Sequence, residues 1–159
     1  MTDLYSLWKA VELGVCPDPD GYAKAIVEAE VRMQMSYYGR DILQKTSVGP
    51  RRTLRLARFT VAELGFPKGS RYDAICERAN ARGLRLCPAE VGLALRLQYV
   101  DQPLGEWLVI AMEPITDEDG DSDLFSLDRG GDALWLLAAW RHPGSFWSPD
   151  DTFVFVLGE

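Results

Sequence analysis

The sequence is short of the residues on which most catalytic and metal-binding motifs depend. It contains one histidine, His142, and three cysteines, and no two cysteines are spaced as a CxxC pair. An odd number of cysteines without that spacing argues against both a disulfide framework and a zinc site. We therefore expect no metal ion and no catalytic thiol, and we interpret Cys16, Cys76 and Cys87 as buried or inert.

Long hydrophobic runs and nucleotide-binding glycine patterns are also missing. The apolar stretch Ala133–Trp140 is less than half of the ~20 residues that a membrane-spanning helix needs. The first residues have neither a basic segment nor a long apolar stretch, so no signal peptide is expected. Without a GxGxxG or Walker A sequence no cofactor is expected either. The chain is predicted to be cytoplasmic, with no membrane partner.

Basic residues are scarce in the C-terminal part of the chain. Residues 98–159 carry 2 Lys+Arg against 13 Asp+Glu, whereas residues 1–97 carry 15 against 11. The two net charges, −11 and +4, sum to the −7 of the whole chain. Because phosphate binding needs clustered cations, the acidic part disfavours nucleic acid or an anionic membrane as a partner.

The composition that remains is that of a globular protein. The 159 residues are 47% hydrophobic and 26% charged, which suits one domain over 1–159. Leu4, Leu7, Trp8 and Val11 recur at i, i+3, i+4 and i+7, a spacing that predicts a helix over 3–13. A second helix is expected over 20–37. Together these helices would form a helical N-terminal extension, residues 1–50.

Short β segments dominate the expected core, residues 53–158. A helix is expected over 71–82, ending before Gly83. Strands are expected at 54–56, 84–86, 93–99, 106–112, 124–127, 133–140 and 153–157. The predicted fold class is α+β: N-terminal helices followed by a mainly antiparallel sheet of about five or six short strands, with one further helix.

Several segments of this core resemble one family. Leu86–Gly92 reads LCPAEVG, Leu95–Tyr99 reads LRLQY, Gly105–Trp107 reads GEW and Met112–Ile115 reads MEPI. In these segments the chain resembles an uncharacterised family of small bacterial proteins from metagenomic and candidate-phylum genomes. The resemblance implies that residues 59–157 form one module, and it brings no function with it.

The segment Asp117–Asp123 has carboxylates at alternate positions, as a calcium-binding loop does. Ser122, however, occupies the position where such a loop needs glycine, and Asp128 stands where the loop needs a glutamate. A solvated hairpin turn is the simpler interpretation, and a weak divalent-cation site is the alternative. His142 shares a loop with serine and aspartate but follows no G-x-S-x-G sequence, so a hydrolytic triad is not expected.

The densest aromatic set lies in the predicted sheet. Ligand pockets combine apolar walls with a few polar groups. Such a pocket would form if the sheet aromatics shared a concave face with a cation and a carboxylate. The candidate ligand-binding residues are therefore Trp107, Trp135, Tyr99, Arg96 and Glu113.

Taken together, these patterns favour a non-enzymatic module that binds a small molecule or a protein. We expect a homo-oligomer, a dimer or higher, associated through the N-terminal segment with Trp8, Met33 and Met35.

Two alternatives remain open. One is a small enzyme that acts on a polar metabolite or glycan through the carboxylates Glu90, Glu106 or Glu113. The other is a regulatory protein that contacts nucleic acid through the arginines of the segment Arg51–Arg58.

Overall fold

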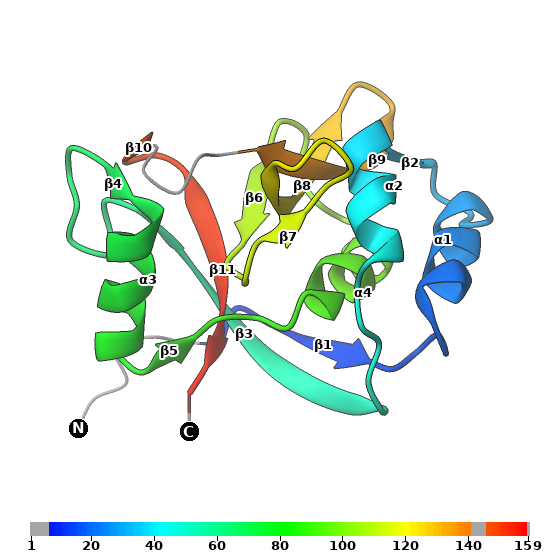
Figure 1. Ribbon diagram of the computed structural model, residues 1–159, viewed down its shortest axis with the longest axis horizontal. Coiled ribbons are helices and arrows are strands. Elements are labelled where there is room, and N and C mark those ends of the chain that lie inside the picture. Colours follow the sequence, from blue (N-terminus) through cyan, green and yellow to red (C-terminus); the bar gives the residue numbers. More distant parts are fainter. Residues whose placement is uncertain (1–6, 141–145, 159) are drawn as a thin grey trace.

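The computed structural model describes residues 7–140 and 146–158. Within them the chain forms four helices and eleven strands (Figure 1). The helices are α1 (Pro19–Val27), α2 (Tyr37–Gln44), α3 (Tyr72–Ala81) and α4 (Glu90–Gln98). The strands are β1 (Lys9–Leu13), β2 (Met33–Met35), β3 (Arg52–Thr60), β4 (Ser70–Arg71), β5 (Leu84–Arg85), β6 (Trp107–Ile110), β7 (Ile115–Thr116), β8 (Ser122–Gly130), β9 (Ala133–Trp140), β10 (Phe146–Trp147) and β11 (Thr152–Leu157). None of these helices is long and apolar enough to span a bilayer.

Nine of the described strands form one mixed sheet that curls into a half-barrel. Its order is β1-β3-β11-β6-β8-β9-β2, with β5 added on β11 and β7 on β8. The pairings β11–β6 and β9–β2 are parallel, and the other pairings of this sheet are antiparallel. A separate two-stranded sheet joins β4 to β10.

Helices cover the two faces of the sheet unequally. α4 packs on the face that carries Phe125, and α1 and α2 pack beside it (Figure 1). The approach of α4 is close: a Cβ at Gly92 would lie 2.7 Å from Cδ2 of Phe125, so glycine is required there. α3 lies against the other face, where the ring of Tyr72 sits 5.8 Å from that of Phe153. Each face of the central strands therefore has its own packing partner.

The N-terminal part is not a helical extension. Residues 9–13, expected to be helical, form β1. In this strand buried Val11 and Leu13 alternate with exposed Ala10 and Glu12. This alternation has the period of a strand, and pairing with β3 over five residue pairs stabilises it. Residues 7 and 8 have no regular secondary structure, and residues 3–6 of the expected first helix lie outside the described residues. The expected second helix is divided into α1, β2 and the start of α2.

The segment 93–99, expected as a strand, is helical. Its alternation of leucine with Arg96 and Gln98 imitates a half-exposed strand. In the structure α4 is buried nearly all round, because Val91–Arg96 are all buried, the arginine included. A helix buried on every side shows no polar stripe.

The predicted fold is therefore wrong in its arrangement: the sheet is larger, mixed, and begins with an N-terminal strand. Other elements are confirmed. The helix expected over 71–82 is α3, and Gly83 follows it with a φ of 87°. The strands expected at 54–56, 84–86, 106–112, 124–127, 133–140 and 153–157 coincide at least in part with β3, β5, β6, β8, β9 and β11.

A buried carboxylate joins the N-terminal segments to α4. Glu90 is 2% exposed and accepts hydrogen bonds from the amides of Gly14 and Gly49, at 2.6 and 3.0 Å, and from the hydroxyl of Tyr22 at 2.6 Å. A buried carboxylate is tolerated only when such donors replace its water. Glu90 thus connects two loops and α1 to the first turn of α4.

Replacing Glu90 by glutamine tests this role. The amide group of glutamine points N–H donors at a site already filled by donors, so at least one of the three loses its acceptor. We expect Glu90→Gln to lower the free energy of unfolding by about 3 kcal/mol, measured by urea denaturation. Glu77→Gln, at an exposed position, is the matched control. Equal urea midpoints for the two variants would show that the hydrogen bonds of Glu90 do not stabilise the fold.

Candidate functional site

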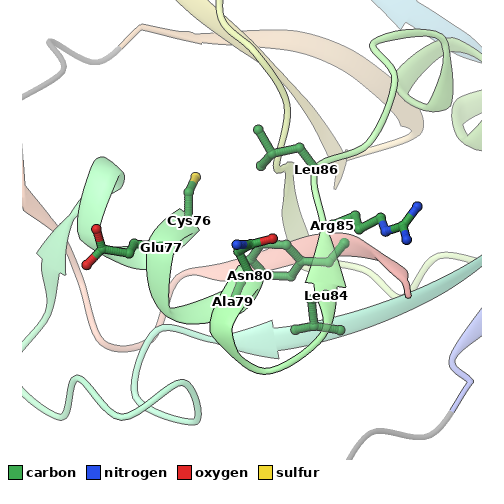
Figure 2. Close-up of a pocket in the computed structure, with 8 residues that line it drawn as sticks. Cys76, Glu77, Ala79, Asn80, Leu84, Arg85 and Leu86 are labelled. Carbon is green, nitrogen blue, oxygen red and sulfur yellow. The ribbon is translucent and has the colours of Figure 1, made fainter. Parts of the chain in front are cut away.

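A cavity of about 250 Å³ lies between α3, β5 and β11. Its apolar wall comes from Ala79, Leu84, Leu86 and Phe155, with Cys76 beside them. The helix turns Ile75 and Ala79 into the core. Positions 76 and 80, one residue further round the helix, therefore face the gap that separates α3 from the β5 segment (Figure 2).

Three polar side chains line the same cavity. Figure 2 shows the amide of Asn80 extending from α3 across the gap, while Glu77 and Arg85 lie at opposite margins and point away from it. Across residues 7–140 and 146–158, none of these three side chains has a hydrogen-bond or ion-pair partner. The cavity therefore presents the unused amide of Asn80 beside an apolar wall, with two charged side chains at its margins, a composition typical of a ligand site.

The thiol in this cavity is not activated. Burial is the main cause that raises the pKa of Cys76 to about 11, and the nearby carboxylates of Glu113 and Asp73 raise it further. A hydrogen bond with Tyr72 acts in the opposite direction and is outweighed. The thiolate is the nucleophilic form of cysteine. Because the thiol of Cys76 stays protonated at neutral pH, it lines the cavity but does not act as a nucleophile.

Two of the predicted ligand-binding residues share one face of the sheet. Asp128 on β8 lies opposite Trp107 on β6 and opposite Trp135 on β9. Directly opposed residues project from the same face, so the carboxylate stands between the two tryptophans. All three side chains are half-buried. We call these three residues the tryptophan row.

Arg96 and Tyr99 lie behind that row, on the face that α4 covers. Arg96 is fully buried, and its Nη1 donates to the carbonyl oxygens of Trp135 at 3.1 Å and Asp128 at 3.4 Å. Burial lowers the pKa of Arg96 to about 10, so it stays charged at neutral pH. Tyr99 is 5% exposed and donates its hydroxyl to Glu106 at 2.7 Å. These two residues hold the sheet from behind and offer no surface to a ligand.

Glu113 stands apart from the other four predicted residues. It is exposed, in the loop after β6, and its charge acts on Cys76 of α3. The structure therefore gathers Trp107, Trp135, Arg96 and Tyr99 around one place in the sheet, but divides them between its two faces. The single concave face expected from the sequence does not form.

The carboxylates of the enzyme alternative are equally dispersed. Glu90 is enclosed by its three donors. Glu106 is held by Arg58 at 2.8 Å and by the hydroxyl of Tyr99. Glu113 is exposed to solvent, so no two of the three face a common site.

The arginines of the nucleic-acid alternative do not form one stripe. Arg55 is an odd number of positions from both Arg52 and Arg58 on β3, so its side chain lies on the opposite face. Arg51 is paired with Glu12 at 3.3 Å, and Arg58 with Glu106. A phosphate backbone would meet these cations one at a time.

The acidic loop is organised by its own backbone rather than around a cation. Oδ1 of Asp117 accepts from the amides of Asp119 and Asp121, at 2.9 and 3.1 Å. The side chains of Glu118 and Asp119 turn outward to two tyrosine hydroxyls of α2. In the described part of the chain, no three histidine, cysteine, aspartate or glutamate side chains are placed to hold a metal ion. His142 lies outside the described residues.

Two carboxyl groups of this loop share a proton. Asp123 is 1% exposed; burial, and then a hydrogen bond with Asp117, raise its pKa to about 7. The same hydrogen bond lowers the pKa of Asp117. Like charges this close do not both ionise readily, so the pair keeps one proton in mildly acidic solution and loses it only as the pH rises through about 7. Asp123 is too buried to meet a substrate.

The α3–β5 cavity was not foreseen from the sequence. Its wall combines residues 76–86 with Phe155, which lies far from them in the sequence. No local sequence pattern predicts that these residues come into contact. The one signal was Arg85, a charged residue between Leu84 and Leu86 in a very short strand.

The thiol of Cys76 should react slowly at neutral pH. With the pKa raised to about 11, the rate of modification by a maleimide in a Cys16→Ser variant should rise about tenfold per pH unit from pH 8 to 10, without a plateau. Free cysteine, the control, levels off above its pKa of ~8.5. A plateau for the protein below pH 9 would contradict the assignment.

Asp123 should make the stability of the protein fall between pH 4 and 7. Its folded pKa is raised, so its contribution is complete below the unfolded value of 3.8 and is lost as pH rises towards 7. Asp123→Asn should remove this slope and melt at a higher temperature than the wild type at pH 8, because its amide can donate to Asp117. Thermal unfolding at pH 4.5, 6 and 8 measures this, with Asp132→Asn as control. An unchanged slope in Asp123→Asn would contradict the shared proton.

Comparisons of the chain with models of known protein families, with curated proteins and with solved structures found no match.

Proposed function

We propose that this protein is a non-enzymatic module that binds a small molecule in the cavity between α3 and β5. The observation that carries the proposal is the pairing of an apolar wall with the amide of Asn80, which extends across the gap, while Arg85 lies at its margin. Both side chains can donate hydrogen bonds. The long, exposed side chain of Arg85 points away from the cavity in Figure 2, and turned inward it would bring a positive charge to the ligand. The two side chains suit a ligand with an apolar body and a carboxylate or carbonyl end.

The size of the cavity limits the ligand further. A cavity of 150 Å³ holds benzene, so 250 Å³ accommodates roughly ten heavy atoms. Pockets for drug-sized ligands begin near ~300 Å³. A compact metabolite such as a short-chain or aromatic acid fits these limits better than a nucleotide or an oligosaccharide.

The chemistry of the lining favours binding over catalysis. The thiol of Cys76 is protonated at neutral pH, and Glu77 points away from the cavity. A catalytic site needs a nucleophile, or an acid and a base, with a pKa tuned to the task. The residues that line this cavity supply neither.

Self-association and location complete the proposal. Trp8 packs within its own chain, edge-on to Tyr99 at 5.3 Å and beneath Arg58, which weakens it as a contact with another copy. Met33 and Met35 lie on β2, an edge strand that pairs only with β9 among the described strands. An open strand edge can pair with a second copy, and we propose this edge for homo-oligomer formation.

Three free cysteines suit the reducing cytoplasm.

A titration with small acids tests the cavity. Benzoate and hexanoate, each at millimolar concentration, should shift the backbone amide signals of residues 76–86 in ¹H–¹⁵N NMR spectra, and benzylamine should shift them far less. Asn80→Ala and Arg85→Ala should each weaken binding at least fivefold. Arg55→Ala removes the same charge from an exposed strand position and should leave binding unchanged.

Two results would overturn this function. One is the absence of any shift at residues 76–86 with either acid. The other is equal weakening by Arg85→Ala and Arg55→Ala, which would reveal attraction to the overall charge rather than a built site.

A further inference from the structure

The tryptophan row is a second feature of the sheet that the cavity does not use. In antiparallel pairing, Trp107 is opposite Asp128 and Asp128 is opposite Trp135. Their neighbours along the strands, Leu127 and Leu134, are at most 1% exposed on the face that α4 covers. The row itself is half-buried on the opposite face and therefore has partial access to solvent.

The row is held rigidly from two directions. Trp107 stacks on Trp147 with ring centroids 6.3 Å apart and an interplanar angle of 23°. Trp147 also contacts Phe153 at 4.9 Å, on β11, which borders β6 on the side away from β8. From behind, Arg96 donates to the carbonyls of Asp128 and Trp135. The stacking therefore fixes Trp107 from the side that does not face the carboxylate.

The carboxylate in the middle of the row interacts with the charge of Arg96 behind the sheet, but has no direct partner among the described residues. Within residues 7–140 and 146–158, no hydrogen-bond donor and no cation is in direct contact with the Asp128 side chain. The surrounding part of the sequence, residues 98–159, carries a net charge of −11. Arg96, behind the sheet, offsets part of the charge of Asp128, and the half-buried carboxylate stays open to a second cation on its own face.

The spacing of the strands determines which cation fits. Neighbouring strands lie ~4.8 Å apart, so two tryptophans separated by one strand begin about 10 Å apart. A cation above Asp128 is then about 5 Å from each indole, inside the ~6 Å limit for a cation–π interaction. A bare ammonium ion would leave much of this space empty, whereas methyl groups fill it and contact both rings.

We propose that Trp107, Asp128 and Trp135 form a binding site for a small alkylated ammonium ion. The carboxylate neutralises the charge and the two indoles enclose the methyl groups. This site is independent of the α3–β5 cavity and takes a ligand of the opposite charge. A neutral sugar ring would stack on the indoles but would gain nothing from the charge of Asp128.

Choline and its uncharged isostere 3,3-dimethylbutanol are the probes. Each is titrated into the full chain, and the indole N–H signals of the tryptophans are followed by ¹H–¹⁵N NMR. Choline should shift the indole signals of Trp107 and Trp135 and bind at least tenfold more tightly than the alcohol. Asp128→Asn should weaken choline binding at least fivefold. Asp132→Asn, which removes the same charge from the neighbouring exposed turn, should change it less than twofold.

A second variant protects the test against misfolding. Trp135→Leu removes one wall without removing charge and should weaken choline binding at least fivefold, with the thermal unfolding temperature recorded for each variant. Equal affinity for choline and the alcohol would overturn the proposal in favour of an uncharged ligand. Equal effects of Asp128→Asn and Asp132→Asn, or no shift of either indole signal with choline, would overturn it as well.

Discussion

The fold depends on one buried helix that is tied at both ends by charged side chains. At the first turn of α4, Glu90 accepts three hydrogen bonds; near its last turn, Arg96 donates to Gln102, Tyr99 and two strand carbonyls. Neither forms an ion pair with any described residue. The signs match the helix dipole, because a carboxylate favours the N-terminal end and a guanidinium the C-terminal end. Removing the side chain of Glu90 or of Arg96 would leave its buried hydrogen-bond partners unsatisfied.

These two anchors explain how a short chain organises so large a sheet. Glu90 fixes the loops around Gly14 and Gly49, which lie at one end of the β1–β3 pairing. Arg96 fixes carbonyls of β8 and β9, near the other end of the sheet. The sheet curls around α4 because both of its distant parts are bound to the same helix. One face is thereby closed, and features open to solvent are left to the other.

The sequence was sufficient to predict those helices and strands whose formation depends on neighbouring residues in the chain. α3 and six strands were predicted because a glycine stop and alternation of polar and apolar residues act over a few positions. β1 was missed because its partner, β3, lies some forty residues further on. α4 was taken for a strand because buried Arg96 was counted as an exposed position. Trp107 and Trp135 were chosen as ligand-binding candidates from the density of aromatic residues alone, whereas the register that places Asp128 between them is set by pairing at long range.

The two proposed sites divide the charge of the molecule between them and share one packing element. The acid site uses Arg85, from the part of the chain with a net charge of +4, and the cation site uses Asp128, from the part with −11. Phe155 on β11 lines the first site, and Phe153, two residues earlier on the same face of the strand, lies beside it. Phe153 contacts Trp147, which stacks on Trp107 of the second site. Both sites therefore inherit their shape from the aromatic face of β11.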